Sequence, residues 1–270
     1  MNMKKIAIVT TVFVVVFAFV PQAQATGEPS KQNFDSQQKE LFTTYGVNSA
    51  QKPCLKIDSK MSQSEALGDN VVPVEYKTLH DKMKPYLRVV PVIYRGFDDS
   101  CVHIGQIVVH RDLVRDTVKL FVGMYKLNFP IKSVIPAAKF KYVARDSMLA
   151  NNTTNYRPER SGSGTLSEHA KGAAFDINPF TNPFMIFDEN GELVFVDPPG
   201  ATYNPSAKGA LYKDSPVRKM WTALDYEWGG NWGDPNADPP TDFFEEGYFD
   251  YQHFQLNFRR YDKLPLPSDI

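Results

Sequence analysis

The chain has 270 residues and a formal net charge of −1 at pH 7, so its charge favours neither a nucleic-acid partner nor an anionic membrane surface. Its length suits one large domain or two small ones and permits a buried core without support from disulfides. Twenty prolines and 13% aromatic residues indicate a loop-rich domain and argue against a helical bundle.

Residues 1–25 have the pattern of a cleaved secretory signal. The start MNMKK is positively charged, the run IAIVTTVFVVVFAFV is apolar, and Ala23-Gln24-Ala25 supplies small residues for a cleavage site. A retained membrane anchor is the alternative, but the run is short for a span of roughly 20 residues. We therefore expect an exported protein, periplasmic or extracellular in the cell envelope, with no stable membrane insertion after cleavage.

Cys54 and Cys101 are the two cysteines of the chain. Outside the cytoplasm such a pair most simply forms a disulfide, which here would tie the N-terminal segment to the body of the domain. Two free thiols are the alternative, because the sequence does not show whether the two Cα atoms lie close enough to bond. A cysteine-based metal site is not expected, since no second cysteine stands near either one.

The first half of the chain is predicted to change from a polar segment to regular structure. Residues 26–52 are polar and have no clear period, so we expect a mobile lead-in or linker that extends to about residue 70. Further on, β-branched runs predict strands, and an amphipathic run that Asp112 can cap predicts a helix. In chain order these elements are strands at Leu87–Tyr94 and Gly105–Val109, a helix over 112–127, extended segments over 129–144 and a long polar loop over 145–168.

The second half mixes strands with one further helix. Ser215 and Pro216 have the residue types of a helix start, and Gly229-Gly230 is expected to end that helix. In HFQLNF, apolar and polar residues alternate, which predicts a strand with one face in the core. The expected elements are a strand in AAFDIN, a hairpin with an extended loop over 179–214, the helix over 215–230 and the strand over 253–258. This order predicts an α+β fold rather than a regular βαβ series.

Two of the five histidines have a carboxylate at a useful place in the sequence. His169 precedes Asp176 by seven residues, and Asp250 precedes His253 by three. A catalytic zinc site uses three nitrogen or oxygen ligands and keeps one position open, which suits His169, Asp176 and His253 if neighbouring strands bring them together. Asp250 would then serve as a general base that accepts the proton of the attacking water.

The residues around these groups fit the same interpretation. Gly172 lets the chain turn between the first histidine and the strand, and we expect Ala173 and Ala174 to leave room for the metal and a substrate backbone. Because residues 250 and 253 of one strand would face opposite sides, Asp250 is expected in a turn before the strand of His253.

Other residues have simpler interpretations. A lone histidine most often has a satisfied hydrogen bond, and we place three in this class: His80, His103 and His110. Arg157 is either a solvated arginine of the polar loop or a group that holds a substrate carboxylate or a developing oxyanion. Three aromatic residues before the last histidine are expected to pack, with a groove wall as the alternative: Trp228, Trp232 and Tyr251. The chain has no H-E-x-x-H, G-x-S-x-G, P-loop or G-x-G-x-x-G motif.

The two histidine segments together resemble a known family. Residues 167–176, SEHAKGAAFD, fit S-x-H-x-x-G-x-A-x-D, and Asp250–His253 fits D-x-x-H. This combination resembles the D-alanyl-D-alanine carboxypeptidase-like zinc peptidases, which include D,D-carboxypeptidases, D,D-dipeptidases and L-alanyl-D-glutamate endopeptidases. The resemblance extends from about Gly105 to Phe258. NNTTNYRP, INPFTNP, DPPG and the group W-G-G-x-W are similar to the endopeptidase-like branch.

The resemblance implies a role for each matching residue. It implies His169, Asp176 and His253 as ligands of one Zn²⁺ per chain, Asp250 as the catalytic base, Arg157 as a substrate or oxyanion contact and Ser167 as a hydrogen-bonding or substrate-binding residue of the site. The base is Asp here where other branches carry Glu. The implied fold is of the Hedgehog type, a small central antiparallel sheet with helices packed on it. Residues 71–270 would form the catalytic domain, with 71–104 as a possible accessory segment.

We therefore expect an exported zinc metallopeptidase that acts as a monomer on peptidoglycan stem peptides, of the D,D-carboxypeptidase or the L-alanyl-D-glutamate endopeptidase type. The alternative is a non-catalytic module that keeps the zinc site to bind cell-wall peptide. Asp250 argues against that alternative, because a binding module has no use for a base. A structural zinc site would require a fourth protein ligand.

Overall fold

The computed structural model describes residues 31–47, 54–97, 101–142, 167–234, 236, 245–257, 260 and 263–267. Within these ranges the chain forms three small three-stranded sheets with helices packed on them, which confirms the α+β class but not a single central sheet. The helices are α1 (Lys31–Tyr45), α2 (Gln63–Leu67), α3 (Lys77–Met83), α4 (Val114–Lys126) and α6 (Pro216–Thr222), with the 3-10 helices η2 (Val74–Tyr76), η3 (Lys84–Tyr86), η4 (Arg111–Leu113), η5 (Ala137–Phe140) and η6 (Gly229–Asn231). The strands are β1 (Leu55–Ile57), β2 (Leu87–Arg95), β3 (Val102–His110), β4 (Ala174–Asp176), β5 (Phe184–Phe187), β6 (Leu193–Asp197), β7 (Tyr226–Trp228), β8 (Tyr248–Asp250) and β9 (His253–Leu256).

The long hairpin β2–β3 confirms the two strands predicted in the first half of the chain. Its strands pair antiparallel along their whole length, from Leu87 opposite His110 to Arg95 opposite Val102. Strand β1 joins the other side of β3 in parallel. This sheet is therefore mixed, whereas the resemblance implied an antiparallel one.

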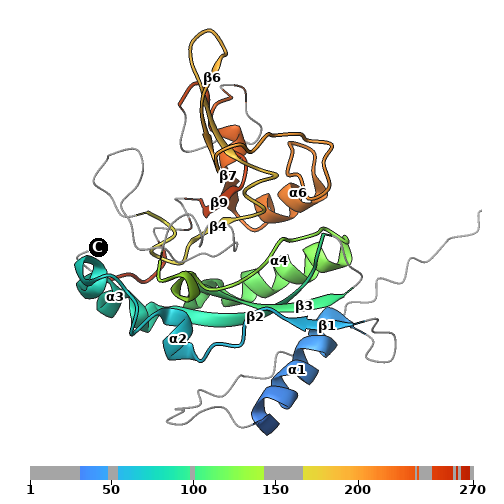
Figure 1. Cartoon of the computed structure of the whole chain (residues 1–270), viewed down its shortest axis with the longest axis vertical. Helices are drawn as coiled ribbons and strands as arrows, with labels where there is room; N and C mark the ends of the chain where they lie inside the picture. Colours follow the sequence, from blue (N-terminus) through green and yellow to red (C-terminus); the bar gives the residue numbers. More distant parts are fainter. Residues whose placement is uncertain are drawn as a thin grey trace, which may run out of the picture.

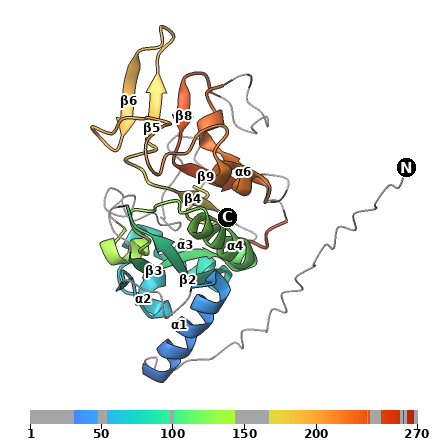
Figure 2. The same cartoon turned by 90° about the vertical axis from the view of Figure 1, so that its right-hand side faces the viewer.

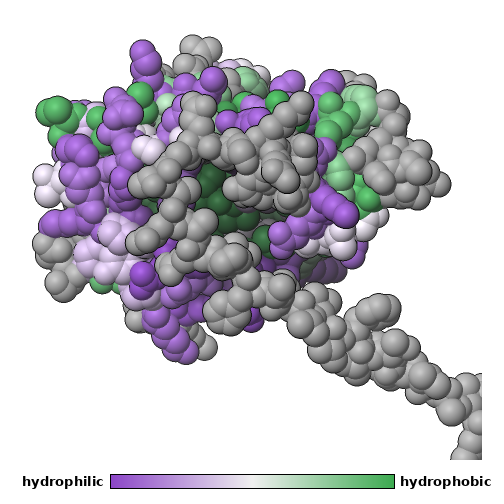
Figure 3. Space-filling view, turned by 90° about the horizontal axis from the view of Figure 1, so that it is seen from below, coloured by the Kyte–Doolittle hydropathy of each residue, from purple (hydrophilic) through white to green (hydrophobic). Residues whose placement is uncertain are grey.

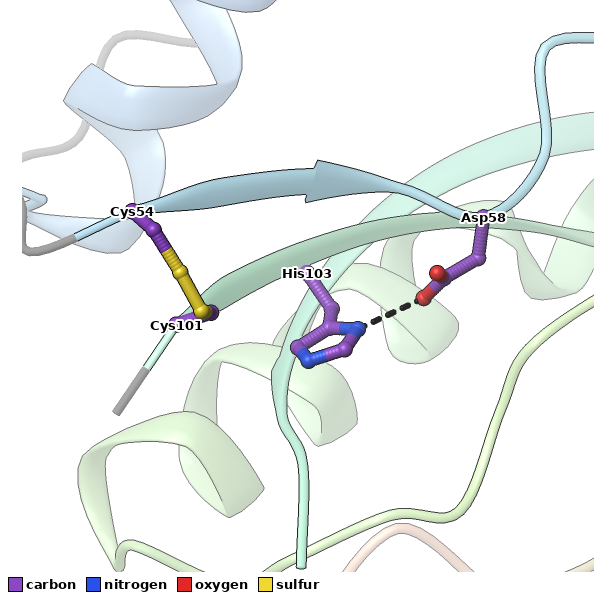
Figure 4. Close-up of a disulfide and its surroundings, with 4 residues drawn as sticks. All are labelled: Cys54, Asp58, Cys101 and His103. Atoms are coloured by element: carbon purple, nitrogen blue, oxygen red, sulfur yellow. Dashed lines mark hydrogen bonds and ion pairs between the residues drawn. A yellow bond between two sulfur atoms is a disulfide. The ribbon is translucent and has the colours of Figure 1, made fainter. Parts of the chain in front are cut away.

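The predicted disulfide between Cys54 and Cys101 is present (Figure 4). The two Cα atoms are 4.7 Å apart, and the cysteines are separated by 47 residues in the sequence. At the other end of β1, the Nδ1–H of His103 donates to a carboxylate oxygen of Asp58 at 2.7 Å. The short parallel strand is thus held against β3 at both ends, by a covalent bond and by a charge-assisted hydrogen bond.

Helix α1 lies where we predicted a mobile lead-in, so that prediction is wrong for Lys31–Tyr45, and it is also wrong for β1 and α2, which lie before residue 70. Near its C-terminal end, Phe42 and Tyr45 are 8% and 1% exposed and belong to the main core. The ring of Tyr45 meets the ring of Tyr125 edge-on, with 6.0 Å between the centroids. Figures 1 and 2 show α1 with this end against the sheet, which explains why most of its sequence carries no apolar period.

Helix α4 packs against the long hairpin on one side and against the second half of the chain on the other. It lies between the sheet β1–β3–β2 and α6 (Figures 1 and 2), and its buried residues include Leu120 and Phe121, both 0% exposed. Gly123 lies against the side chain of Met220 in α6, where a Cβ would collide with the sulfur atom. The glycine therefore lets the two helices approach closely, and one continuous core fills both sides of α4.

Two elements of the second half differ from the prediction. Helix α6 begins as expected, because the Ser215 hydroxyl accepts the amide of Arg218, but it ends at Thr222. Asp225 then takes a positive φ of 62°, and Tyr226–Trp228 forms β7 instead of continuing the helix. The segment 129–144 was predicted as extended, yet residues 137–140 form η5. The predicted helix over 112–127 and the hairpin within 179–214 are confirmed by α4 and by β5–β6.

The described surface seen from below in Figure 3 is mostly hydrophilic, with apolar residues in small groups. In the part of the chain that the structure describes, no helix has the length and apolar character needed to cross a membrane.

Candidate metal centre

One face of the sheet β4–β9–β7 is polar and the other belongs to the core. Strand β9 is central and pairs antiparallel with both neighbours. In this register Asp176 stands directly opposite His253, so both side chains leave the sheet on the same side. The residues that alternate with them, Phe175 and Phe254, are 0% exposed and pack around Trp221. The period of two therefore separates the hydrophobic core from the polar groups of the site.

His169 approaches the same point from a turn that precedes β4. The amide of Gly172 donates to the carbonyl of His169 at 3.2 Å, and the amide of Ala173 donates to the carbonyl of Glu168 at 3.0 Å. Gly172 has a positive φ of 69°, which confirms the turn that we predicted for it. The hydroxyl of Ser167 accepts the amide of His169 at 3.4 Å. His169 is only 3% exposed, so the turn points its imidazole inward.

The three side chains meet at distances that fit one tetrahedral zinc ion. Nε2 of His169 lies 3.2 Å from Nδ1 of His253, Oδ2 of Asp176 lies 3.3 Å from the first atom, and Oδ1 of Asp176 lies 3.1 Å from the second. In a tetrahedral site with bonds near 2.0–2.1 Å, neighbouring ligand atoms are about 3.3 Å apart. The donor set of two imidazoles and one carboxylate also matches what zinc prefers. Among the described residues, no fourth His, Cys, Asp or Glu completes this group.

The electrostatics of the three groups favour bound positive charge. Burial raises the pKa of Asp176, but the charges and hydrogen bonds of His169 and His253 outweigh this effect and hold that pKa well below its usual range. Burial lowers the pKa of His253, but the hydrogen bond and charge of Asp176, with the charge of Asp250, raise it above the usual value. A divalent cation between the three groups would satisfy the same carboxylate without protons on the imidazoles.

Residues 161–256 match a family model described as D-alanyl-D-alanine carboxypeptidase. The matched segment contains both motifs, from the turn before β4 to the last residue of β9. This part of the chain is similar to the D-alanyl-D-alanine carboxypeptidase family. The family is typically zinc-dependent, and the resemblance seen in the two motifs is thereby confirmed. Comparison with curated proteins and with solved structures returned no match.

Asp250, the family-type candidate for the base, ends β8 and is separated from β9 by two residues. Strand β8 belongs to the sheet β6–β5–β8, so Asp250 and His253 lie on strands of two different sheets. We expected Asp250 in a turn; the structure instead places the turn at residues 251 and 252. A Cβ on Gly229 would lie 2.6 Å from the carbonyl oxygen of Asp250, so this glycine lets Asp250 approach the turn after β7. The negative charge of its carboxylate helps to raise the pKa of His253.

The other predicted site residues have different outcomes. Arg157 lies outside the described residues, and Ser167 is 5% exposed and contacts the turn of His169. We expected Ala173 and Ala174 to line open space at the site, but both are 0% exposed and pack in the interior, so that prediction is wrong. The three aromatic residues before His253 are packed, as predicted. Trp228 is 4% exposed and Trp232 is 7% exposed, and the ring of Tyr203 stacks on the ring of Tyr251.

The three histidines assigned no chemistry have hydrogen-bond partners, as predicted. His80 contacts the carbonyl of Leu67 at 3.2 Å, and His110 contacts the carbonyl of Pro265 at 3.0 Å. His103 donates to Asp58, as described above. Burial lowers the pKa of His110, which favours its neutral form.

Gly172→Ala is expected to weaken both the fold and zinc binding. The substitution strains a backbone with positive φ, and its Cβ would lie 2.5 Å from the amide nitrogen of His110. The turn that carries His169 must then shift. Gly191→Ala is the matched control, because Gly191 has a φ of 78° but nothing within 4 Å of its Cβ position. We expect a loss of about 1 kcal/mol for the control. For Gly172→Ala we expect a larger loss with weaker zinc binding, as measured by thermal unfolding and zinc titration; equal effects in both variants would contradict this reading of the turn.

Sequence reasoning missed two polar residues on the same face as the ligands. Gln255 lies two residues after His253, and Glu227 stands opposite Gln255 on β7. Gln255 had been placed on the polar face of its strand, but no partner was assigned to it. The alternation of HFQLNF was the available signal, because it puts residues 253 and 255 on one face. The pairing with β7 is a tertiary feature, and this is why Glu227 carried no signal.

Proposed function

We propose that the protein is an exported zinc metallopeptidase that hydrolyses peptide bonds in peptidoglycan stem peptides. The observation that carries the proposal is the convergence of two imidazoles and one carboxylate, with contacts of 3.1–3.3 Å between them, inside the segment that matches the family model. In this proposal His169, Asp176 and His253 hold one zinc ion. Three protein ligands leave one coordination position for the reaction.

A bound zinc ion would polarise the scissile carbonyl and lower the pKa of the attacking water toward ~7. A carboxylate oxygen of Asp250 accepts a proton from that water while the water oxygen bonds to the carbonyl carbon. The carboxyl group of Asp250 then gives this proton to the leaving nitrogen as the carbon–nitrogen bond breaks, so the base is regenerated. Arg157 is proposed to hold a substrate carboxylate or the developing oxyanion, and Ser167 to keep the turn of His169 in place or to contact substrate.

The substrate and the location rest on three supports. The family description names D-alanyl-D-alanine, a cell-wall dipeptide unit. Residues 1–25 have the pattern of a secretory signal, and the disulfide is a bond typical of oxidising compartments. We therefore propose a cell-envelope enzyme, a monomer, with the peptidoglycan stem peptide as its partner. The D,D-carboxypeptidase and L-alanyl-D-glutamate endopeptidase types remain the two candidates for the bond that is cut.

Digestion of purified muropeptides tests this function. We expect mass analysis to show either the loss of one terminal alanine, which identifies a D,D-carboxypeptidase, or separation of the stem after its first L-alanine, which identifies the endopeptidase. A chelator should abolish the reaction, and added zinc should restore it. Muropeptides that stay intact with the folded, zinc-loaded enzyme would overturn the proposed function.

A further inference from the structure

The imidazole of His253 has two contacts with different chemistry. Its Nδ1 faces the other ligands, 3.2 Å from His169 and 3.1 Å from Asp176. Its Nε2 points the opposite way and lies 3.1 Å from Oε1 of Gln255. A neutral imidazole carries its proton on one nitrogen only, and only the tautomer with the proton on Nε2 leaves the Nδ1 lone pair for a metal. An acceptor at Nε2 selects this tautomer.

The side-chain amide of Gln255 provides such an acceptor only in one orientation. If the amide were flipped, its NH₂ group would face Nε2 and favour the wrong tautomer. The cross-strand neighbour of Gln255 is Glu227, which is 8% exposed and accepts the indole N–H of Trp232. A carboxylate only accepts hydrogen bonds, so the NH₂ side of the amide belongs toward Glu227 and Oε1 toward His253.

Trp232 supports this arrangement from the other side. Its indole is 7% exposed, and its ring lies 5.0 Å from the ring of His253. The indole of Trp232 thus donates to Glu227, Glu227 stands opposite Gln255 in the sheet, and Gln255 contacts the imidazole of His253. Glu227 and His253 are 8% and 7% exposed, so rotation of either side chain would leave an unmade hydrogen bond in a nearly dry environment, where it is costly.

We propose that Gln255 is a positioning residue of the metal centre, which accepts the Nε2–H of His253 and so presents Nδ1 to the metal, while Glu227 sets the orientation of the amide. The inference rests on the metal centre of the proposed function. Groups that hold the second nitrogen of a histidine ligand typically contribute a factor of about 10–100 to metal affinity.

Gln255→Met tests the proposal, because methionine has nearly the same shape and at most a weak acceptor. Zinc affinity is measured by competition with a chromophoric chelator, and we expect a loss of about 10–100-fold. Gln255→Glu retains an acceptor oxygen, and it is combined with Glu227→Gln to avoid two facing carboxylates. We expect the zinc affinity of this double variant to lie within about threefold of the wild-type affinity. The control is Gln106→Met. Gln106 lies in β3, in another sheet, and the substitution removes its hydrogen bonds with Ser59 and Met61.

We expect the control to lower the melting temperature without changing zinc affinity. Wild-type affinity in a folded Gln255→Met variant would overturn the proposal, and so would an equal loss in the double variant that combines Gln255→Glu with Glu227→Gln. A wild-type protein that binds no zinc would instead refute the metal centre itself, which separates the two failures.

Discussion

Asp250→Asn is expected to lower kcat by about 10²–10⁴-fold, the usual contribution of a general base, while zinc content stays near one ion per chain. The amide has nearly the same shape as the carboxylate but cannot take a proton from the attacking water. Asp250 ends β8 and is not one of the three converging side chains, so its replacement leaves the ligand set intact. Turnover of muropeptides and zinc content are measured on the same preparation.

Asp214→Asn is the matched control for this variant. Its side chain is 80% exposed and pairs with Lys219, so we expect kcat to stay at the wild-type value. The comparison also separates the enzyme from the alternative of a non-catalytic binding module. A binding module would retain its affinity for cell-wall peptide in Asp250→Asn and would show no turnover in either protein. Wild-type turnover in Asp250→Asn would show that another group serves as the base.

His253→Ala is expected to abolish zinc-dependent activity and to weaken zinc binding by about 10²-fold or more. Structural zinc sites with four ligands bind with about 10–16 kcal/mol, so one ligand accounts for about 3 kcal/mol, a factor of about 10². In this protein the removal of His253 leaves His169 and Asp176 as the remaining candidate ligands. The proposed metal centre would then have two ligands in place of three.

Thermal unfolding with and without zinc measures this effect independently of activity. A ligand at a concentration of a thousand times its dissociation constant stabilises the fold by about 4 kcal/mol. Zinc should therefore raise the melting temperature of the wild type, and it should raise the melting temperature of His253→Ala much less. His103→Ala is the control, because His103 holds Asp58 in the sheet of the long hairpin. We expect it to lower the melting temperature but to keep the shift caused by zinc. A full zinc-induced shift in His253→Ala would rule out this ligand set.

Local sequence patterns predicted those elements whose period spans most of their length. The β-branched runs of β2 and β3, the amphipathic face of α4 and the alternation in β9 each repeat over several residues, and the structure confirms them. The disulfide was predicted from cysteine number and compartment. By contrast, the buried residues among the described side chains of α1 are Phe42 and Tyr45, and two such residues near the C-terminal end of a helix do not give a recognisable apolar period.

The end of α6 shows a different limit. The residues after Thr222 continue a helical pattern, but Tyr226–Trp228 gains more from pairing with β9, which places Trp228 opposite Phe254 in the core. The sheet partner lies about thirty residues further along the chain, and no local pattern reports it. The same holds for Ala173 and Ala174, whose small side chains reflect close packing in the interior and not an open substrate site.

The sequence by itself determined which imidazoles and carboxylates are present, their spacing in two motifs, and through these motifs the resemblance to a known family. Only the tertiary structure decided how they meet. It placed Asp176 opposite His253, brought His169 to the same point through the turn at Gly172, and put Gln255 behind the imidazole. The physical reason is that strand register and cross-sheet contacts join residues far apart in the chain, and such pairings depend on how the whole core packs.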